Sequence, residues 1–184
     1  QPVGANGMPS IIVPRKTVNE VQKLLEESEG EVSIQVSDTK INFAFSDIVL
    51  TSKLIDGKFP DYNRVIPSNN DKSLTVDSKA FGQSVDRVSA VSSEKSRAVK
   101  LSLESDKLTF TVSNPDSGSA TDELSVGYGS EAMEIGFNAR YLLDITGQLD
   151  GDTATFELAD SGSPTVIRDE KDEDALYVLM PMRV

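Results

Sequence analysis

The residues Leu74-Thr75-Val76-Asp77-Ser78-Lys79-Ala80-Phe81 contain the junction around which the rest of the chain is organised. Leu74 to Val76 has the composition of a short strand, and Asp77-Ser78 is a suitable N-cap for a helix. Phe81 then opens an apolar helical face that continues through Val85 and Val88. The stretch therefore predicts a strand that leads directly into a helix of residues 78–91.

The same junction occurs three times at nearly equal spacing. The predicted strands end at Val13, Val76 and Phe137, which are 63 and 61 residues apart. Three residues after each strand end lies a base, and five residues after it lies a large apolar side chain. The bases are Lys16, Lys79 and Arg140, and the apolar residues are Val18, Phe81 and Leu142. A fixed period with matched positions indicates a repeated architecture.

Each junction is followed by three or four segments with the alternation of antiparallel strands. We expect strands at residues 11–13, 32–36, 41–45, 48–55, 74–76, 98–113 (a hairpin), 124–128, 133–137, 154–158, 165–167 and 176–180, and helices at 15–29, 78–91 and 139–149. The predicted class is α+β, built from three strand–helix–antiparallel-sheet half-units. Because such units pack in paired layers, we expect one complete pair, residues 72–184, and an unpaired half, residues 1–71.

The charge balance excludes several kinds of protein. The 184 residues include 18 Lys and Arg against 30 Asp and Glu, which gives a net charge of −12. Such a surface repels nucleic acid on average and argues against a broad basic DNA-binding face. The absence of Cys excludes disulfides and suits a reducing compartment. Because the first residue is Gln1, we expect a fragment or a processed product.

The residues of a catalytic or metal site are missing. The chain has no histidine and no nucleophile-elbow, phosphate-loop or dinucleotide-binding motif. Asp150 to Ser161 begins like a calcium loop but lacks its central Gly and closing Glu. The acidic run Asp169 to Asp174 is typical of a solvated loop. We therefore expect neither an enzyme nor a bound cofactor or metal.

The stretch Leu176-Tyr177-Val178-Leu179-Met180-Pro181-Met182-Arg183-Val184 contains the longest run of large apolar residues in this acidic chain. Leu176 to Met180 predicts a strand, which Pro181 ends because proline has no N–H to donate. Two interpretations are open at this point. Either the tail is the last piece of the core, or its Met-Pro-Met end lines an adaptable hydrophobic groove.

Five segments together resemble a known family. They are Ile12 to Lys16, Thr51 to Leu54, Phe59 to Tyr62, Glu134 to Asn138 and Tyr177 to Arg183. Their order and spacing resemble the bacterial DNA polymerase III beta subunits, the replicative sliding clamps, over nearly the whole chain. The resemblance implies the DNA-clamp fold, with three domains of two half-units per subunit and two subunits in a ring. It implies that residues 1–71 are the second half of the middle domain and residues 72–184 the complete third domain.

For function, the resemblance implies a processivity factor that encircles duplex DNA without reading its sequence, in the bacterial cytoplasm at the nucleoid. Basic side chains on the inner helices make weak contacts in that family, and the matching residues are Arg15, Lys16, Lys79 and Arg140. Phosphate contacts of this kind position DNA but read no sequence. Lys23 and Arg87 are further candidates, diluted by Glu20 and Asp86. The alternative is that these bases are only solvated charges at helix ends.

The family also has a hydrophobic pocket that binds short linear motifs of polymerases, the clamp loader and repair proteins. The matching residues are Pro60, Arg64, Val65, Asn138, Tyr141, Val178, Leu179, Met180, Pro181, Met182 and Arg183. Such a pocket offers apolar walls to Leu or Phe anchors, with Asn138 and Arg64 to orient the peptide. The segment Gly162-Ser163-Pro164 departs from the family pattern, which has a Val and a Ser on the pocket wall.

A second function is a purely structural domain whose role is ring closure. In the family the third domain pairs with the first domain of the neighbouring subunit, and Ala90 and Val91 match the apolar contact there. The strand region after Asp116 matches the acidic partner surface. The resemblance implies a homodimeric ring for the full-length protein, whereas we expect the fragment to be monomeric or unable to form a ring.

Overall fold

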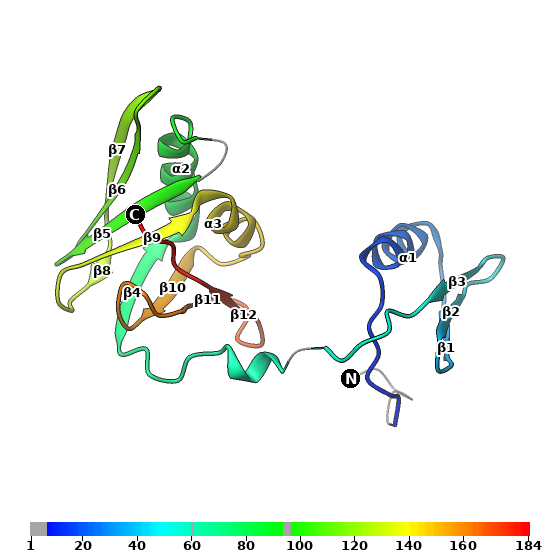
Figure 1. Ribbon diagram of the computed structural model, residues 1–184. Coiled ribbons are helices and arrows are strands. Elements are labelled where there is room, and N and C mark those ends of the chain that lie inside the picture. The colour runs from blue at the N-terminus through cyan, green and yellow to red at the C-terminus, as the bar shows by residue number, and fades with distance from the viewer. Residues whose placement is uncertain (1–6, 60, 94–96) are drawn as a thin grey trace. The chain divides into compact units, whose positions relative to one another are not determined.

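The computed structural model describes residues 7–59, 61–93 and 97–184 (Figure 1). The chain divides into two compact units, Gln1–Asp61 and Tyr62–Val184, which we call unit 1 and unit 2 and describe separately. The described residues form three antiparallel sheets, of three, five and four strands, together with α-helices. The predicted α+β class with repeated half-units is therefore confirmed.

In unit 1 a helix packs against one sheet. Helix α1 (Arg15–Glu27) precedes β1 (Ser33–Val36), β2 (Lys40–Ala44) and β3 (Val49–Lys53), which form a sheet in the order β1-β2-β3. Alternation along β2 directs Ile41 and Phe43 to a small core, which Phe45 completes. Val21 and Leu24 of the helix pack against this core. The helix ends two residues earlier than predicted, where glutamates oppose its dipole.

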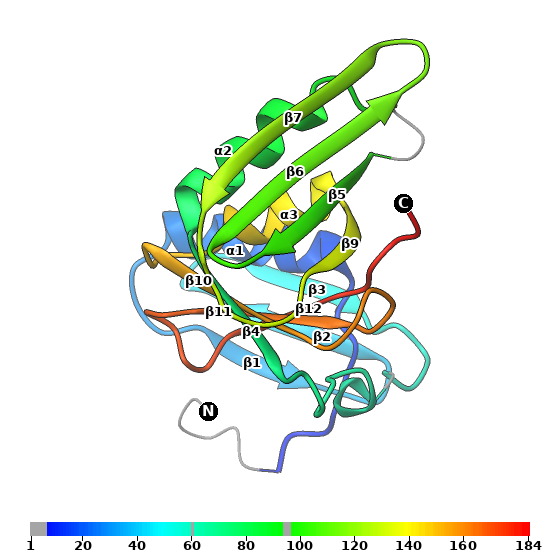
Figure 2. The same ribbon diagram turned by 90° about the vertical axis from the view of Figure 1, so that its left-hand side faces the viewer.

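Unit 2 contains two further passes of the same element order. Its first pass consists of η1 (Tyr62–Arg64), β4 (Lys72–Asp77), α2 (Ser78–Ser89), β5 (Ala98–Glu104), β6 (Lys107–Asn114), β7 (Gly118–Ser125) and β8 (Gly127–Tyr128). The second consists of β9 (Met133–Asn138), α3 (Ala139–Thr146), β10 (Thr153–Leu158), β11 (Thr165–Asp169) and β12 (Leu176–Leu179). Figure 2 shows β5, β6 and β7 side by side, with α2 along them.

The two passes of unit 2 exchange their first strands. Strand β4 pairs with β10 of the other pass, and β9 pairs with β5. The sheet orders are accordingly β12-β11-β10-β4-β8 and β7-β6-β5-β9. In one sheet, β4 of the first pass is followed by three strands of the second pass, β10, β11 and β12. In the other sheet, β9 of the second pass is followed by three strands of the first pass, β5, β6 and β7. In unit 2 each pass thus supplies its first strand to the sheet of the other pass.

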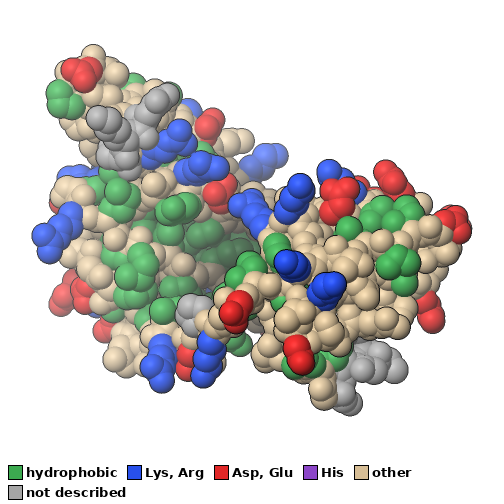
Figure 3. Space-filling view, turned by 45° about the vertical axis from the view of Figure 1, so that its right-hand side comes forward, with side chains coloured by type: hydrophobic (Ala, Val, Ile, Leu, Met, Phe, Trp, Pro, Cys, Tyr) green, Lys and Arg blue, Asp and Glu red, His purple; other side chains and the backbone are tan. Residues whose placement is uncertain are grey.

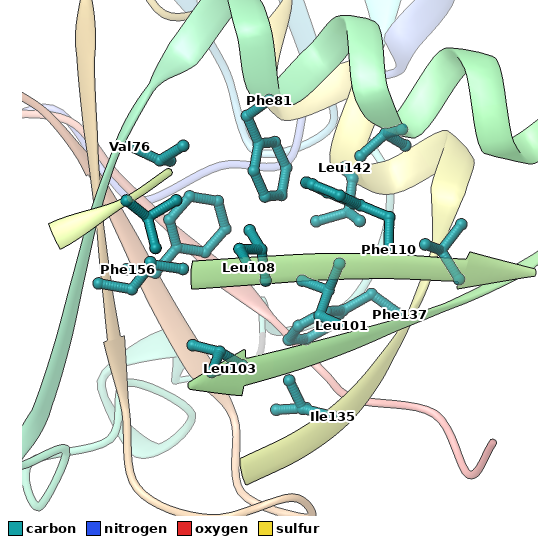
Figure 4. Packing of buried hydrophobic residues seen from close by; sticks show 14 of the residues in the cluster. Val76, Phe81, Leu101, Leu103, Leu108, Phe110, Ile135, Phe137, Leu142 and Phe156 are labelled. Carbon is teal, nitrogen blue, oxygen red and sulfur yellow. The ribbon is translucent and has the colours of Figure 1, made fainter. Parts of the chain in front are cut away.

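The core of unit 2 lies between its two sheets and its two helices. Phe81 of α2 and Leu142 of α3 point into it and are fully buried (Figure 4). The Phe81 ring centroid lies 5.3 Å from that of Phe110 and 4.9 Å from that of Phe156. Phe110 and Phe156 belong to different sheets, so Phe81 joins the two layers. Phe81, the first apolar residue of the predicted helix face, therefore lies at the centre of the packing in unit 2.

Both helices of unit 2 have side-chain N-caps, including the one predicted at Asp77. The Asp77 side chain accepts a hydrogen bond from Ala80 N at 2.7 Å, and Asn138 Oδ1 accepts one from Arg140 N at 2.9 Å. Both caps satisfy N–H groups that a helix leaves open at its start. Helix α1 begins after Pro14 and has no side-chain cap. Proline is tolerated at the start of a helix because its missing N–H would have no partner there, but its side chain cannot accept a cap hydrogen bond.

The predicted strand of residues 11–13 is wrong for this structure. These residues lie outside any strand, although Ile12 O accepts a hydrogen bond from Ile55 N at 3.0 Å. In unit 2 the corresponding strands β4 and β9 are extended by pairing with the other pass. Unit 1 offers no second pass among its described residues, so the segment lacks the strand that would complete its ladder.

Two further boundaries differ from the sequence prediction. Residues 114–119 were expected as a loop, yet β7 begins at Gly118 and pairs along its whole length with β6. Strand β7 lies at the edge of its sheet and exposes alternate residues, which are polar. The start of the strand therefore could not be distinguished from a loop by composition. Helix α3 ends at Thr146 instead of residue 149, since Gly147 already lies at its C-cap.

Candidate functional site

An apolar pocket of about 360 Å³ lies between α3 and the last strand of unit 2. Its lining residues are Tyr141, Asp144, Ile145, Val178, Leu179 and Met180. Tyr141 and Ile145 are four residues apart and therefore share one helix face. The Tyr141 side chain is 56% exposed and Met180 is 60% exposed, whereas Leu179 is buried. Figure 3 shows hydrophobic side chains gathered on the side of unit 2 that contains these elements.

The tail beyond β12 crosses from one sheet of unit 2 to the other. Met182 N donates a hydrogen bond to Gly136 O at 2.7 Å and forms an isolated antiparallel bridge with β9. A Cβ on Gly136 would overlap the Val184 side chain and lie 2.7 Å from Met182 O. Glycine is therefore required for this crossing. Leu179 belongs to the core, whereas Met180 is exposed, so the core interpretation covers only part of the tail and the groove interpretation stays a prediction.

A second hollow of about 650 Å³ follows the crossing tail. Its lining residues are Glu134, Ile135, Gly136, Ser161, Gly162, Pro181, Met182, Arg183 and Val184. Lys100 Nζ donates to Glu134 Oε1 at 2.8 Å, and this hydrogen bond lowers the pKa of Glu134. The Gly162 and Ser163 N–H groups donate to Asp160 Oδ1, each at 2.8 Å, and lower the pKa of Asp160. The hollow thus has a polar rim, unlike the apolar pocket beside it.

The structure brings most predicted peptide-binding residues to these two hollows. Tyr141, Val178, Leu179 and Met180 line the apolar pocket, and Pro181, Met182 and Arg183 line the second hollow. Asn138 lies where β9 meets α3, and its side-chain oxygen caps the helix. Arg64 and Val65 are exposed at the end of η1 and are not among the lining residues. Pro60 lies outside the described residues.

Sequence reasoning missed several residues of these hollows. Ile145 was not among the predicted peptide-binding residues, although its i, i+4 spacing from Tyr141 was a sufficient signal. Asp144 forms the polar edge of the apolar pocket and lies 4.0 Å from Arg140. Glu134 and Gly136 gave no local signal, because only the tertiary crossing of the tail brings them to the second hollow.

The four predicted DNA-facing bases occupy equivalent places on three helices. Arg15 and Lys16 are the first two residues of α1, and Lys79 and Arg140 are the second residues of α2 and α3. All four are exposed. Within unit 2, α2 and α3 approach closely, since a Cβ on Gly82 would lie 3.1 Å from Thr146 Oγ1. Two of the four bases therefore belong to adjacent helices.

Arg87 has a different environment from these bases. Its Nη2 and Nε atoms donate to Asp122 Oδ2 at 2.6 and 3.0 Å, which joins α2 to β7. This contact lowers the pKa of Asp122. Lys23 likewise lies 3.6 Å from Glu20 within α1. Both side chains have acidic partners, but only Lys23 pairs with the nearby carboxylate that the sequence suggested, whereas the partner of Arg87 is Asp122 and not Asp86.

The predicted subunit-interface residues lie at the C-terminal end of α2. Ala90 is exposed, while Val91 is half-buried against the core of unit 2. The Val91 carbonyl accepts a hydrogen bond from Asn114 Nδ2 at 3.0 Å, which fixes this end of the helix to β6. The edge strand β7 carries Asp122 and Glu123 and lies at the outer side of the same sheet.

No helix in the described part of the chain has the length and apolar character needed to cross a bilayer. No group of three or more acidic side chains in residues 7–59, 61–93 and 97–184 is arranged to hold a metal ion.

Comparisons with known families match both units. Residues 2–61 match the model of the DNA polymerase III beta subunit, central domain, and residues 63–183 match that of the DNA polymerase III beta subunit, C-terminal domain. Among curated relatives, the beta sliding clamp of Caulobacter vibrioides (strain NA1000 / CB15N) is 52% identical over 183 residues, covering 100% of this chain and 49% of the relative. The Escherichia coli K12 beta sliding clamp is 39% identical over 175 residues, covering 95% of this chain and 48% of the relative.

Solved structures agree with these relatives. A sliding clamp from Bartonella birtlesii, bound to griselimycin, is 55% identical with a TM-score of 0.95, and the match covers 100% of this chain and 50% of that one. The Caulobacter crescentus polymerase III beta structure is 52% identical with the same TM-score of 0.95, again covering 100% and 50%. The chain spans about half the length of the relatives it matches. By sequence and by fold, it belongs to the DNA polymerase III beta subunit family, the bacterial sliding clamps.

Proposed function

We propose that this chain is part of a ring-forming sliding clamp that encircles duplex DNA and binds linear motifs of replication and repair proteins. Residues 1–71 are assigned to the second half of a middle domain, and residues 72–184 to a complete third domain. The family membership supports the clamp role, and no catalytic step is needed for it. The apolar pocket beside α3 is the observation that supports motif binding.

The pocket suits a short peptide with large apolar anchors. Tyr141, Ile145, Val178 and Met180 supply aromatic, branched and thioether surfaces, and thioethers repack easily around different ligands. An exposed apolar surface of this kind is unfavourable in water unless a partner covers it. The adjoining second hollow contributes Arg183 and a polar rim, which suits the backbone and polar side chains of the same peptide.

Contacts with DNA are proposed for Arg15, Lys16, Lys79 and Arg140. Their equivalent places at helix starts suit a surface that meets the phosphate backbone without reading bases. Because few phosphates are neutralised against a net charge of −12, the binding is expected to be weak and to decline steeply with salt. Binding that survives high salt, or that prefers one sequence, contradicts this role.

Peptide binding is tested by fluorescence anisotropy with a labelled clamp-binding motif peptide and the full-length protein. Tyr141→Ala and Met180→Ala are each expected to weaken binding about 10-fold or more, because each removes an apolar contact of ~1.5–3 kcal/mol that the bound peptide would bury. Leu176→Ala is the matched control, since Leu176 lies on the same strand but outside the pocket lining. Equal affinity in all three variants assigns unit 2 to the purely structural role instead.

A further inference from the structure

A third hollow of unit 2, of about 360 Å³, lies where the end of α2 meets the start of α3, two helices that pack against each other (Figure 1). It shares only Asp144 with the apolar pocket and no residue with the second hollow. Ala90 and Val91, the predicted subunit contact, are not among its lining residues. We call it the basic hollow, because its polar lining includes Arg97, Arg140, Ser89 and Ser92.

Arg97 has an unfavourable backbone conformation. Its φ is 43°, in the left-handed region that a residue with a Cβ avoids. Two backbone hydrogen bonds hold it there, since Arg97 N donates to Ser93 O at 3.1 Å and Ala139 N donates to Arg97 O at 2.8 Å. Glycine would adopt this conformation without the steric cost. The backbone therefore favours glycine at this position, and what arginine adds is its guanidinium group.

The charge of Arg97 is not balanced by its surroundings. No acidic side chain of the described residues forms an ion pair with it, although both Arg87 and Arg168 have such partners. Through its carbonyl, Arg97 also contacts the first residue of α3, and Arg140 is the second residue of that helix. The helix dipole is positive at this end and disfavours cations. Two guanidinium groups therefore lie in an already positive potential.

The acid in the lining, Asp144, offsets this charge only in part. Its Oδ2 atom lies 4.0 Å from Arg140 Nε, which is too far for a hydrogen bond. The Ser89 hydroxyl already donates to Asp86 O at 3.0 Å, whereas the hydroxyl of Ser92 can donate to a ligand. The basic hollow thus combines a net positive charge with hydrogen-bond donors, which is the combination that binds an oxyanion.

The opposite end of the same helix pair provides an internal comparison. Ser78, the first residue of α2, donates its N–H to Asp152 O at 2.8 Å, as Ala139 of α3 does to Arg97 O. Asp152 directly precedes β10, and Arg97 directly precedes β5. The equivalent position is therefore an acid beside α2 and a base beside α3. An acid suits the positive end of a helix, so it is the arginine that lacks a counter-charge.

We propose that the basic hollow binds a phosphate group between Arg97 and Arg140, with Ser92 as a further donor. Guanidinium groups present paired N–H donors that match phosphate oxygens. The phosphate belongs either to the backbone of duplex DNA or to a free small phosphate, because both offer the same chemistry. The duplex source deepens the proposed DNA contact and rests on it, whereas the free-phosphate source does not.

The duplex source is tested with the full-length protein, by fluorescence anisotropy of a labelled duplex at several salt concentrations. Losing one phosphate contact reduces the slope of log affinity against log salt by about 1. We expect this reduction for Arg97→Gln and for Arg140→Gln. Lys107→Gln is the charge-matched control, because Lys107 pairs with Glu123 on β7, outside the basic hollow, and we expect it to leave the slope unchanged.

Arg97→Gly separates a role in binding from a role in folding. It removes the guanidinium group but adopts a φ of 43° without strain. We expect the same reduced salt slope as in Arg97→Gln, together with a melting temperature equal to or above that of the wild type. A lower melting temperature with an unchanged slope shows that Arg97 is only structural and contradicts the proposal.

The free-phosphate source is tested by an NMR titration of the 184-residue chain with inorganic phosphate at constant ionic strength, with chloride as the comparison anion. A site that holds a free phosphate gives saturating shifts of the Arg97 and Arg140 Nε–H signals, with a dissociation constant of about 1 mM. These shifts are expected to be lost in Arg97→Gln and kept in Lys107→Gln.

The two measurements together decide the site and its source. A reduced salt slope in Arg97→Gln assigns the phosphate to the duplex backbone, and saturating shifts with an unchanged slope assign it to a small phosphate. The proposal is overturned if Arg97→Gln changes neither measurement. A wild-type protein that fails to bind the duplex contradicts the proposed DNA contact instead, and the phosphate titration then decides the site alone.

Discussion

Unit 1 and unit 2 have the same sequence pattern, but unit 2 buries many more of its apolar side chains than unit 1. Val21 and Leu24 of helix α1 pack against a core of three buried side chains, whereas α2 and α3 share a much larger one. The segment that precedes each helix differs in the same way, since β4 and β9 each pair with a strand of the other pass, whereas residues 11–13 lie outside any strand. A half-unit therefore folds locally but depends on another half-unit for burial.

The comparison predicts its largest effect at the first apolar position of the helices. Phe81→Ala is expected to reduce the unfolding free energy of unit 2 by ~3–5 kcal/mol, because a fully buried aromatic ring leaves a cavity. Val18→Ala, at the equivalent exposed position of unit 1, is expected to cost less than ~1 kcal/mol. Urea unfolding followed by circular dichroism measures both. Similar losses for the two variants contradict the difference between the units.

The next largest loss of stability is expected at Gly136, which immediately precedes the predicted strand end Phe137. Gly136→Val is expected to destabilise unit 2 by ~1–3 kcal/mol, since its side chain would overlap the tail at Met182 and Val184. Unit 1 has Ile12 at this position and accepts the same backbone bond, so its crossing segment must leave more room. Gly129→Val is the control, because a Cβ there meets nothing within 4 Å. A harmless Gly136→Val shows that the tail is not fixed on β9.

A smaller loss of stability is expected from removing the hydrogen bonds that Asp169 makes to a loop of unit 2. The described residues of unit 1 contain no equivalent of this contact. The buried Asp169 carboxylate accepts hydrogen bonds from the Lys171, Asp150 and Gly151 N–H groups, at 3.0, 2.7 and 3.2 Å, and the Lys171 bond contributes most to its lowered pKa. Gly151 O in turn accepts from Ser78 Oγ at 2.6 Å, which ties the loop to the start of α2.

A carboxyl group whose pKa is lowered by folding stabilises the protein above its unfolded pKa, and this contribution is lost as the pH falls through the folded pKa. Asp169→Asn is therefore expected to lower the melting temperature of unit 2 at pH 7, with a difference from the wild type that shrinks below about pH 4. Melting curves across this pH range test the expectation. A constant difference at every pH assigns the effect to shape instead of charge.

The smallest effects are expected from the surface ion pairs of the helices. Arg87→Ala removes the two-bond contact between α2 and Asp122 and is expected to cost ~0.5–1 kcal/mol, decreasing with salt. Lys23→Ala removes only a 3.6 Å pair within α1 and is expected to cost less than ~0.5 kcal/mol. Chemical unfolding at low and high salt compares them. A larger effect for Lys23 reverses the order that the geometry indicates.

Sequence alone determined the features that depend on near neighbours. The repeat spacing, the helices after Val13, Val76 and Phe137, and the caps Asp77 and Asn138 were all predictable, because a cap bond and a helical stripe involve residues only a few positions apart. The inward side chains of the hairpins followed from their alternation. The lining role of Tyr141 and Met180 was assigned by resemblance, and the structure brings these two residues to one pocket.

Only the tertiary structure decided which strands pair between passes and what each apolar face meets. The composition of Ile11-Ile12-Val13 is as strand-like as that of Leu74-Thr75-Val76, yet only β4 forms, since β10 supplies its ladder from far along the chain. Gly136 could not be connected with Met182 from sequence, because their contact depends on where the tail crosses the sheet. Strand pairing and burial between layers depend on both passes of unit 2. The sequence of one half-unit therefore specifies its own helix and strands, but not which strands of another half-unit pair with them.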